Sequence, residues 1–533
     1  MYKKELIPLL SAYLSAGRKF SLSKKIYKIG TRGSLLAVTQ CTQVKEELEK
    51  LTGDQFELEI IKTQGDLITD KPLWQLDGKD FFTKELDEAL LTNKVDMVVH
   101  SYKDLGSERP QGIKLAAITK RHFAHDILFI KNETIKNLSN KKEFIVGTSS
   151  PRRIVNIEAQ LSEYLPTDNI KVETKMLRGN VNTRIGKLVD GQYDAIVLAL
   201  PGIERLAHSE KSLEELKVLL KDLNYMILPQ STFPSAASQG ALAIECNEEN
   251  TELYQKLQLI EDKVTVSEVS RERQAFNGYG GGCHLAVGVN VKRVGDNYIH
   301  SHRGKNEDKS ISELRLESVS ETFKGDKTNA FIGLPLEKVN GESHYIYDEF
   351  INKEQSSPIS LNEKADFFAT SNYCINQLEN SRDSINNLWA AGTKTMKQLA
   401  KKGFWVNGTS DSLGHDELEI LRQSKCIQVM NPKMSLNILT HRDSVSDIGK
   451  VIGCYERIET PMSDEYRRKL EQSEVFFWTS FNQYQRFCAQ VPSIKDKFHC
   501  TGLGKTKQKF DENNIAAKAF IGIEDFKAWL KEE

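Results

Sequence analysis

Short apolar runs alternate with longer amphipathic stretches between residue 26 and about residue 245 of the chain. Apolar runs bounded by turn residues predict strands, and apolar positions three and four apart predict helices. Strands are predicted at 26–29, 56–61, 95–99, 144–146, 170–174 and 194–200, and helices at 84–91 and 151–165. The alternation indicates an α/β fold with a mostly parallel sheet.

Charged and hydroxyl side chains follow four of these strands directly. They are Arg32 and Ser34, Lys103 and Asp104, Arg152 and Arg153, and Arg178 and Arg184. Ligands of α/β folds bind at the carboxyl ends of strands, close to helix N-termini. We therefore expect the four junctions to converge on one sheet edge and to form a binding site there.

The arginines of GTSSPRR (147–153) indicate the charge of the ligand. Ser150 and Pro151 suit the start of a helix, so Arg152 and Arg153 fall in its first turn, where the helix dipole disfavours them. An anion would favour this placement, because guanidinium groups bind carboxylates through two parallel hydrogen bonds. No glycine-rich phosphate loop accompanies these arginines, so a polycarboxylate fits better than a phosphate. The alternative is a set of solvated surface arginines.

A second feature is the segment FNGYGGGCHLAVG (276–288), where three glycines precede Cys283. Such a loop leaves the thiol accessible, which a nucleophilic or modified cysteine requires. The alternative is a tight turn with an incidental buried cysteine.

Length and composition limit the possible classes of protein. A chain of 533 residues is too long for one core and suggests two to four domains. With Lys+Arg 73 and Asp+Glu 74, the net charge of −1 gives no overall basic field for nucleic acid. The eight cysteines include no CxxC pair, which argues against a zinc site or a disulfide framework and for a reducing, cytoplasmic compartment. We expect no metal.

No apolar run reaches the length of a membrane span. The opening MYKKELIPLLSAYLSAG has some features of a signal peptide, but Glu5 and Pro8 interrupt it and its leucines suit one helix face. Residues 1–25 are therefore interpreted as an N-terminal extension, and no membrane partner is expected.

Eight motifs, taken in order, resemble one family, hydroxymethylbilane synthase (porphobilinogen deaminase). They are RGSLLAVTQ (32–40), IKTQGD (61–66), GKDFFTKELDEALL (78–91), VDMVVHSYKDL (95–105), GTSSPRR (147–153), RGNVNTR (178–184), SQGALAIE (238–245) and GGCHLAVG (281–288). The resemblance runs from about residue 28 to 325 and preserves both order and spacing.

The resemblance implies a fold of two periplasmic-binding-protein-like domains and a small α+β domain, here within 26–325. The small domain, about 246–325, would carry a dipyrromethane cofactor linked to Cys283 through a thioether. The implied reaction joins four molecules of porphobilinogen, with loss of ammonia, into hydroxymethylbilane. The implied partner is this small molecule alone, and the implied state is a monomer. A remote alternative is an anion-binding protein similar to solute receptors, which would have no use for the GGC segment.

The resemblance also implies roles for the residues at the strand ends. Asp104 matches the catalytic aspartate, whose carboxylate stabilises the cationic pyrrole formed as ammonia leaves. The implied supporting donors are Ser34, Lys79 and Lys103, the last of which also serves catalysis. The arginines that would hold the acetate and propionate groups of cofactor and substrate are Arg32, Arg152, Arg153, Arg178 and Arg184.

The chain departs from the family pattern at several positions. His284 and Ala286 stand in the cysteine loop, where the family has Ser and Pro, and Asp77 and Asp80 add negative charge near an anion site. Gly106 stands where the family has a Pro after the KDL sequence. Asn247 stands where the family often has an Arg after the strand of the SQGAL motif. These changes bear on substrate affinity and loop closure rather than on the reaction.

Residues 326–533 contain an internal repeat. FFATSNYCINQL (367–378) recurs as FFWTSFNQYQRF (476–487), and WAAGTKTMKQLAKKGF (389–404) recurs as CTGLGKTKQKFDENNI (500–515). Each copy predicts strand, turn, helix, strand, turn and helix, and hence a two-lobed α/β region. The region resembles uroporphyrinogen-III synthase, with Tyr455 as a catalytic and Thr506 as a substrate-binding hydroxyl. The alternative is a non-catalytic interaction module.

Overall fold

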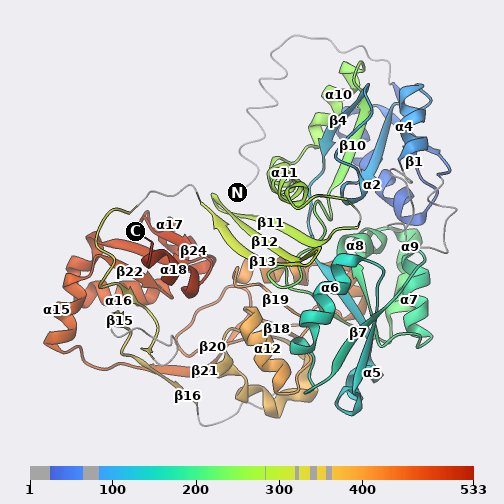
Figure 1. Cartoon of the computed structure of the whole chain (residues 1–533). Helices are drawn as coiled ribbons and strands as arrows, with labels where there is room; N and C mark the ends of the chain where they lie inside the picture. Colours follow the sequence, from blue (N-terminus) through green and yellow to red (C-terminus); the bar gives the residue numbers. More distant parts are fainter. Residues whose placement is uncertain are drawn as a thin grey trace.

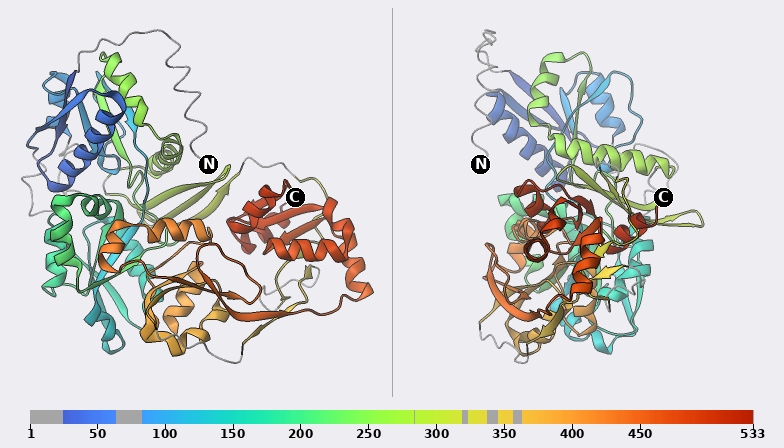
Figure 2. Two further views of the ribbon diagram at one scale, coloured as in Figure 1. Left: turned by 180° about the vertical axis from the view of Figure 1, so that it is seen from behind. Right: turned by 90° about the vertical axis from the view of Figure 1, so that its left-hand side faces the viewer.

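The computed structural model describes residues 25–63, 83–282, 284–318, 323–336, 345–355 and 363–532. These residues form five sheets, each with its own helices, that lie side by side (Figures 1 and 2). No helix in these ranges is both long enough and apolar enough to cross a membrane.

The first sheet has the order β2-β1-β3-β10-β4. β1 pairs in parallel with β2 and β3, whereas β10 lies antiparallel between β3 and β4. Its strands are β1 (Ile26–Thr31), β2 (Gln55–Ile60), β3 (Met97–Ser101), β4 (Ile113–Ile118) and β10 (Leu242–Asn247). Its helices are α2 (Leu35–Thr52), α4 (Lys84–Leu91) and α10 (Thr251–Leu257).

The second sheet repeats this plan in the order β7-β6-β8-β5-β9. Here β6 is parallel to β7 and β8, and β5 is antiparallel to β8 and β9. Its strands are β5 (Asp126–Lys131), β6 (Glu143–Gly147), β7 (Lys171–Lys175), β8 (Ala195–Ala199) and β9 (Leu223–Ile227). Its helices are α5 (Asn132–Lys136), α6 (Pro151–Gln160), α7 (Val181–Val189), α8 (Leu200–His208) and α9 (Glu210–Leu220).

The chain passes between these two sheets twice, at residues 119–125 and 228–241, which we call the first and second crossovers. Because β5 and β10 each arrive from the other sheet, they run antiparallel to their neighbours. The prediction of α/β architecture is confirmed, but the prediction of a mostly parallel sheet is wrong for this reason. The helix predicted at 151–165 ends at Gln160 and continues as a 3-10 turn, η4 (Leu161–Tyr164).

The third sheet is an antiparallel meander that follows α11 (Lys263–Gly278). Its strands are β11 (Ala286–Val294), β12 (Asn297–Asn306) and β13 (Lys309–Glu317). It is anchored to the first crossover by Arg121, which pairs with Glu268 and Glu272 of α11 at 3.0 and 2.9 Å and donates to the Val291 carbonyl at 3.1 Å.

The described residues between 331 and 530 form two further sheets. The fourth has the order β15-β14-β22-β23-β24 and the fifth the order β16-β21-β20-β17-β18-β19. The strands of the fourth are β14 (Phe331–Ile332), β15 (Ile346–Tyr347), β22 (Val475–Trp478), β23 (Phe498–Gly502) and β24 (Lys518–Phe520). Those of the fifth are β16 (Ile351–Glu354), β17 (Ala365–Ala369), β18 (Ile385–Ala390), β19 (Gly408–Thr409), β20 (Leu436–His441) and β21 (Lys450–Ile458).

The chain enters the fourth sheet, leaves along β16 for the fifth, and returns along β21 (Figure 1). β16 and β21 pair antiparallel as the link between the two sheets. The turn after β17 continues as 3-10 helices, η7 (Asn372–Cys374) and η8 (Asn376–Ser384), where the repeat predicts an α-helix. The helices are α12 (Thr393–Lys401), α13 (His415–Arg422), α14 (Lys425–Met430), α15 (Asp464–Gln472), α16 (Phe481–Gln490), α17 (Lys505–Glu512) and α18 (Ile523–Leu530).

The second and fifth sheets share their hydrophobic cores. Edge strands β9 and β19 lie together, and the Ile227 amide donates to the Asn407 carbonyl at 2.8 Å. Tyr225 packs with Trp389 and donates through its hydroxyl to Asn387 at 2.7 Å. These two parts of the chain therefore form one packed body.

Candidate active site

Lys103 and Asp104 lie in a 3-10 turn, η2 (Tyr102–Asp104), directly after the buried strand β3. Arg273 of α11 holds this turn by donating to the carbonyls of Tyr102 at 3.3 Å, Leu105 at 3.2 Å and Gly106 at 3.0 Å. Its guanidinium also stacks over the Tyr102 ring, 4.5 Å from the centroid. The exposed Asp104 carboxylate is thus presented on a fixed turn, which favours a role in chemistry over a role in packing.

Lys103 reaches from this turn toward the second sheet. Its ammonium donates to Gln239 of the second crossover at 3.2 Å. Burial lowers the pKa of Lys103; the negative charge of Asp104 opposes this, and the positive charge of Arg153 adds to it. The side chains predicted from two separate junctions therefore lie within electrostatic reach of each other.

Arg152 and Arg153 lie in the first turn of α6, as predicted, and both are buried. They share one carboxylate, that of Asp126, through contacts of 2.8 Å from Arg152 and of 3.0 and 2.7 Å from Arg153. Arg153 also donates to the Val197 carbonyl at 3.0 Å, and Gln239 donates to Asp126 at 2.9 Å. An arginine offers five N–H donors, so each guanidinium keeps donors for a ligand.

Sequence reasoning missed Asp126 and Gln239. Burial alone would raise the pKa of Asp126, but Arg152 and Arg153 hold it well below its ordinary value, so the carboxylate is ionised at neutral pH. The sequence feature that could have pointed to Asp126 is its position directly before the apolar run ILFI (127–130). Gln239 stands inside the SQGALAIE motif but was not singled out.

Arg178 and Arg184 flank the start of α7, whose N-cap Asn180 accepts from the Thr183 amide at 2.9 Å. Arg184 donates to the Gly179 carbonyl at 2.7 Å. Burial lowers the pKa of Arg184 to about 10, and the positive charges of Arg153 and Arg178 contribute to this shift. Clustered guanidinium groups that depress one another's charged form favour the binding of an anion.

Arg32 and Ser34 lie at the start of α2. Ser34 caps this helix by accepting from the Ala37 amide at 3.3 Å. The next residues, Leu35 and Leu36, pack against the core of the second sheet. This end of α2 therefore lies at the junction of the two sheets.

The expectation that four junctions meet at one sheet edge is wrong. Arg32 and Lys103 follow strands of the first sheet, whereas Arg152 and Arg178 follow strands of the second. The crossovers bring the strand ends of the two sheets toward each other. The candidate site therefore lies between two domains.

Cys283 lies outside the described residues, as do Lys79, Asp77 and Asp80. The three glycines before Cys283 all have left-handed backbone, with φ of 105°, 63° and 91° at Gly280, Gly281 and Gly282. Side chains other than glycine rarely adopt this conformation, so the GGG sequence is required by the path of the chain here. His284, which departs from the family pattern, is exposed, and Ala286 begins β11.

A dipyrromethane bearing carboxylate side chains fits the charges at this site. Arg153 is buried and Lys103 and Arg184 are half-buried, and burial together with neighbouring positive charge lowers the pKa of Lys103 and of Arg184. Carboxylates supply the missing negative charge and match the guanidinium fork.

Tyr455 and Thr506 lie on different elements of the C-terminal region. Tyr455 is on linking strand β21, with its ring 5.2 Å from that of Tyr373 and 5.5 Å from that of His441. Thr506 is in the first turn of α17 and donates to the Thr479 carbonyl at 3.2 Å. Among the described residues, no hydrogen bond or ring contact joins Tyr455 to Thr506.

A buried cluster of Asp87, His100 and Glu245 has the residue types and spacing of a metal site. Arg109 occupies it instead, donating to Asp87 at 2.5 Å and to both oxygens of Glu245 at 2.8 Å. The guanidinium pairs with both carboxylates, so this cluster is interpreted as a structural ion-pair network.

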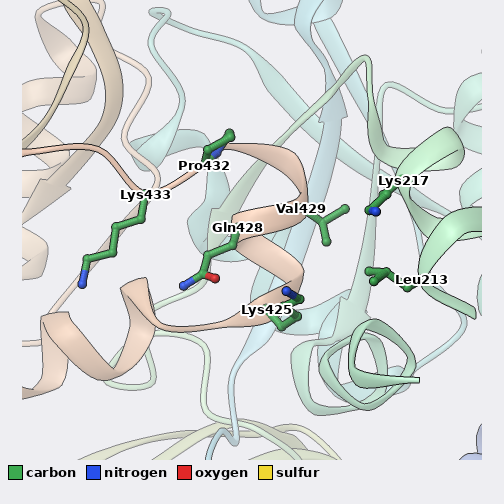
Figure 3. Close-up of a pocket in the computed structure, with 7 residues that line it drawn as sticks. All are labelled: Leu213, Lys217, Lys425, Gln428, Val429, Pro432 and Lys433. Atoms are coloured by element: carbon green, nitrogen blue, oxygen red, sulfur yellow. The ribbon is translucent and has the colours of Figure 1, made fainter. Parts of the chain in front are cut away.

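A pocket of about 420 Å³ lies between α9 and α14 (Figure 3). Its lysines include Lys217 and Lys433, which pair with Glu214 and Glu419 at 2.7 and 2.9 Å. None of the predicted site residues lines this pocket, and it marks a groove on the joint between the two halves of the chain rather than the candidate site.

Comparison with known proteins identifies a family that this chain resembles in sequence. Residues 27–255 match the family model "Porphobilinogen deaminase, dipyromethane cofactor binding domain". A porphobilinogen deaminase of Lachnospira eligens is 41% identical over 267 residues, which cover 49% of this chain and 83% of the relative. The porphobilinogen deaminase of Streptococcus sanguinis is 37% identical over 277 residues, covering 51% and 84%. A probable porphobilinogen deaminase of Pyrobaculum islandicum is 38% identical over 263 residues, covering 49% and 81%.

Proposed function

The chain belongs to the porphobilinogen deaminase family, and on that premise we propose that residues 26–325 synthesise hydroxymethylbilane from four molecules of porphobilinogen. The observation that carries the proposal is the exposed Asp104 on a fixed turn, beside a cluster of buried and half-buried cations between two domains. The dipyrromethane cofactor of this family supplies the pyrrole end to which new units are added. We propose that Cys283 carries it.

In this proposal, some residues of the chain stabilise the charge that develops during the reaction, and others orient the pyrrole rings. Asp104 stabilises the positive charge that develops on the pyrrole as ammonia leaves, and accepts a proton when each ring couples. Arg152, Arg178 and Arg184 hold acetate and propionate groups, which orients each ring for attack. Lys103 interacts electrostatically with both the aspartate and the arginines and can donate to either a carboxylate or the leaving amine.

The test is the intact mass and turnover of the purified chain. We expect a covalent addition of two pyrrole units and the conversion of porphobilinogen into hydroxymethylbilane. A chain that carries no pyrrole adduct and releases no bilane would reject the proposed function.

We further propose that residues 326–533 act as a uroporphyrinogen-III synthase. The observation that supports this is the pair of linked sheets, with a half-buried tyrosine on the link. Burial raises the pKa of Tyr455 to about 12, so its hydroxyl is protonated at neutral pH and can donate a hydrogen bond. In this role, Tyr455 would help the hydroxyl group of the bilane to leave, and Thr506 would help to hold a carboxylate. The alternative remains a non-catalytic module.

The experiment uses the full chain, because its two halves share a core. Supplied with porphobilinogen, the parent chain is expected to yield mainly uroporphyrinogen III. Tyr455→Phe should shift the product toward isomer I, which forms without a catalyst, while porphobilinogen consumption stays unchanged. Tyr347→Phe, on β15 of the neighbouring sheet, is the control. Isomer I from the parent chain would reject the synthase activity.

A further inference from the structure

One segment of the C-terminal region contacts the second crossover and the third sheet of the N-terminal part. It consists of the loop 410–414 and helix α13, which follow edge strand β19. The backbone bond from Ile227 to Asn407 brings this segment to the end of β9, where the second crossover begins. The segment therefore lies where the two domains that carry the candidate site are joined.

Asp411 binds the second crossover. Its carboxylate accepts from the Ser231 amide at 2.9 Å and from the Ser231 hydroxyl at 2.5 Å. Asp411 and the next residue, Ser412, have φ of 50° and 67°, in the left-handed region that non-glycine residues rarely adopt. Such a conformation persists only where surrounding contacts hold it, and the two bonds to Ser231 are contacts of this kind.

Glu417 binds the third sheet. It is 7% exposed and pairs with Lys292 of β11. Burial would raise the pKa of Glu417, but the positive charge of Lys292 lowers it. Lys292 directly follows Val291, whose carbonyl accepts from Arg121 of the first crossover at 3.1 Å. One carboxylate of the C-terminal region thus binds a strand that is joined to the first crossover.

Short contacts connect these two residues to the candidate site. Asp126, directly after the first crossover, pairs with Arg152 and Arg153, and its carbonyl accepts from the Leu228 amide of the second crossover at 3.0 Å. Gln239, farther along the second crossover, joins Asp126 to Lys103. A shift of either crossover therefore moves Lys103 relative to the arginines.

From this arrangement we infer that Asp411 and Glu417 are positioning residues for bilane synthesis, although both belong to the C-terminal region. They fix the two crossovers and the third sheet against one another, and thereby fix the Asp104 turn relative to the arginines. This inference rests on the deaminase function proposed above and is independent of any synthase activity. It gives residues 326–533 a part in the first reaction.

The test is Glu417→Gln in the full chain, with Glu419→Gln as the matched control. Both residues lie on α13, but Glu419 pairs with Arg422 and Lys433, away from the crossovers. We expect Glu417→Gln to lower kcat for porphobilinogen consumption about five-fold or more, a typical coupling between separate sites. It should also change which enzyme-bound pyrrole intermediate accumulates in native mass spectrometry after limited substrate. Glu419→Gln should match the parent in both.

Lys292→Gln provides the second variant, because it removes the same ion pair from the side of the third sheet. The double variant should lose little more activity than either single one, since the two residues act through one contact. If Glu417→Gln and Lys292→Gln both retain the parent's kcat and intermediates, the inference is overturned, even where their thermal stability falls. An inactive parent chain would instead reject the deaminase function itself.

Discussion

Replacement of Asp126 by Asn tests how the arginine pair of the candidate site is held. Asp126 is 1% exposed, and its two oxygens receive three hydrogen bonds from Arg152 and Arg153 and one from Gln239. Asn keeps the shape but removes the charge, and its NH₂ group faces a guanidinium donor. The variant leaves two buried positive charges without a counter-ion.

The expected cost is about 3–5 kcal/mol in the free energy of unfolding, the usual penalty for breaking a buried ion pair from one side. Glu173→Gln is the control, because Glu173 pairs with Lys171 at 2.5 Å on the exposed face of the same sheet. An exposed pair of this kind contributes about 1 kcal/mol or less. The two variants remove the same charge from one domain and differ in burial.

Urea unfolding monitored by tryptophan fluorescence measures both costs. Because the arginines lower the pKa of Asp126 in the folded state, its stabilising effect is complete above the ordinary aspartate pKa of about 3.9. The gap between parent and Asp126→Asn should therefore be constant from about pH 5 to pH 8 and should narrow below about pH 4. An Asp126→Asn variant no less stable than Glu173→Gln would refute the reasoning.

Three further predictions concern the proposed reaction. Asp104→Asn should lower turnover by several orders of magnitude, on the order of 4 kcal/mol, with an unchanged urea midpoint, because Asp104 is exposed. Cys283→Ala should remove the mass of two pyrrole units from the purified protein, and peptide mapping that finds the adduct elsewhere would contradict this. Arg178→Lys keeps the charge but loses the bidentate fork, so one elongation intermediate should accumulate in native mass spectra; a uniform rise in KM with no such intermediate would argue against separate carboxylate clamps.

The sequence predicted individual elements better than their assembly. The helix Lys84–Leu91 has the predicted bounds, and the helix with Arg152 and Arg153 in its first turn begins at Pro151 after Ser150, as expected. These features depend on neighbours in sequence, namely the spacing of apolar residues and a proline that suits the first helical position. The direction of β5 and β10 depends on chain crossings between domains, which leave no periodic signal, so the parallel sheet was predicted wrongly.

In the candidate site, too, features that depend on sequence neighbours were predicted and features that depend on the assembled fold were missed. Lys103, Asp104 and the arginines were found because they interrupt apolar patterns at strand ends. Asp126 was missed because one acidic residue before a strand is common at the start of ordinary surface strands. Its role depends on two arginines 26 and 27 positions away, and only the fold brings these three residues together.

The joint between the two halves of the chain was the least predictable part, and its composition explains why. Tyr225, Phe368 and Trp389 are fully buried there, each on a strand that would be apolar in any α/β core. Extensive permanent interfaces use the same residue types as cores, so the sequence indicates that these side chains are buried but not which partner buries them. The Tyr225–Asn387 bond adds a polar contact within this layer.

Removal of residues 326–533 would expose the layer along β9, so a loss of activity in a truncated chain could reflect unfolding as well as a loss of chemistry. Substitutions at Tyr455 and Glu417 keep the joint intact, and therefore separate the contributions of the C-terminal region to each reaction.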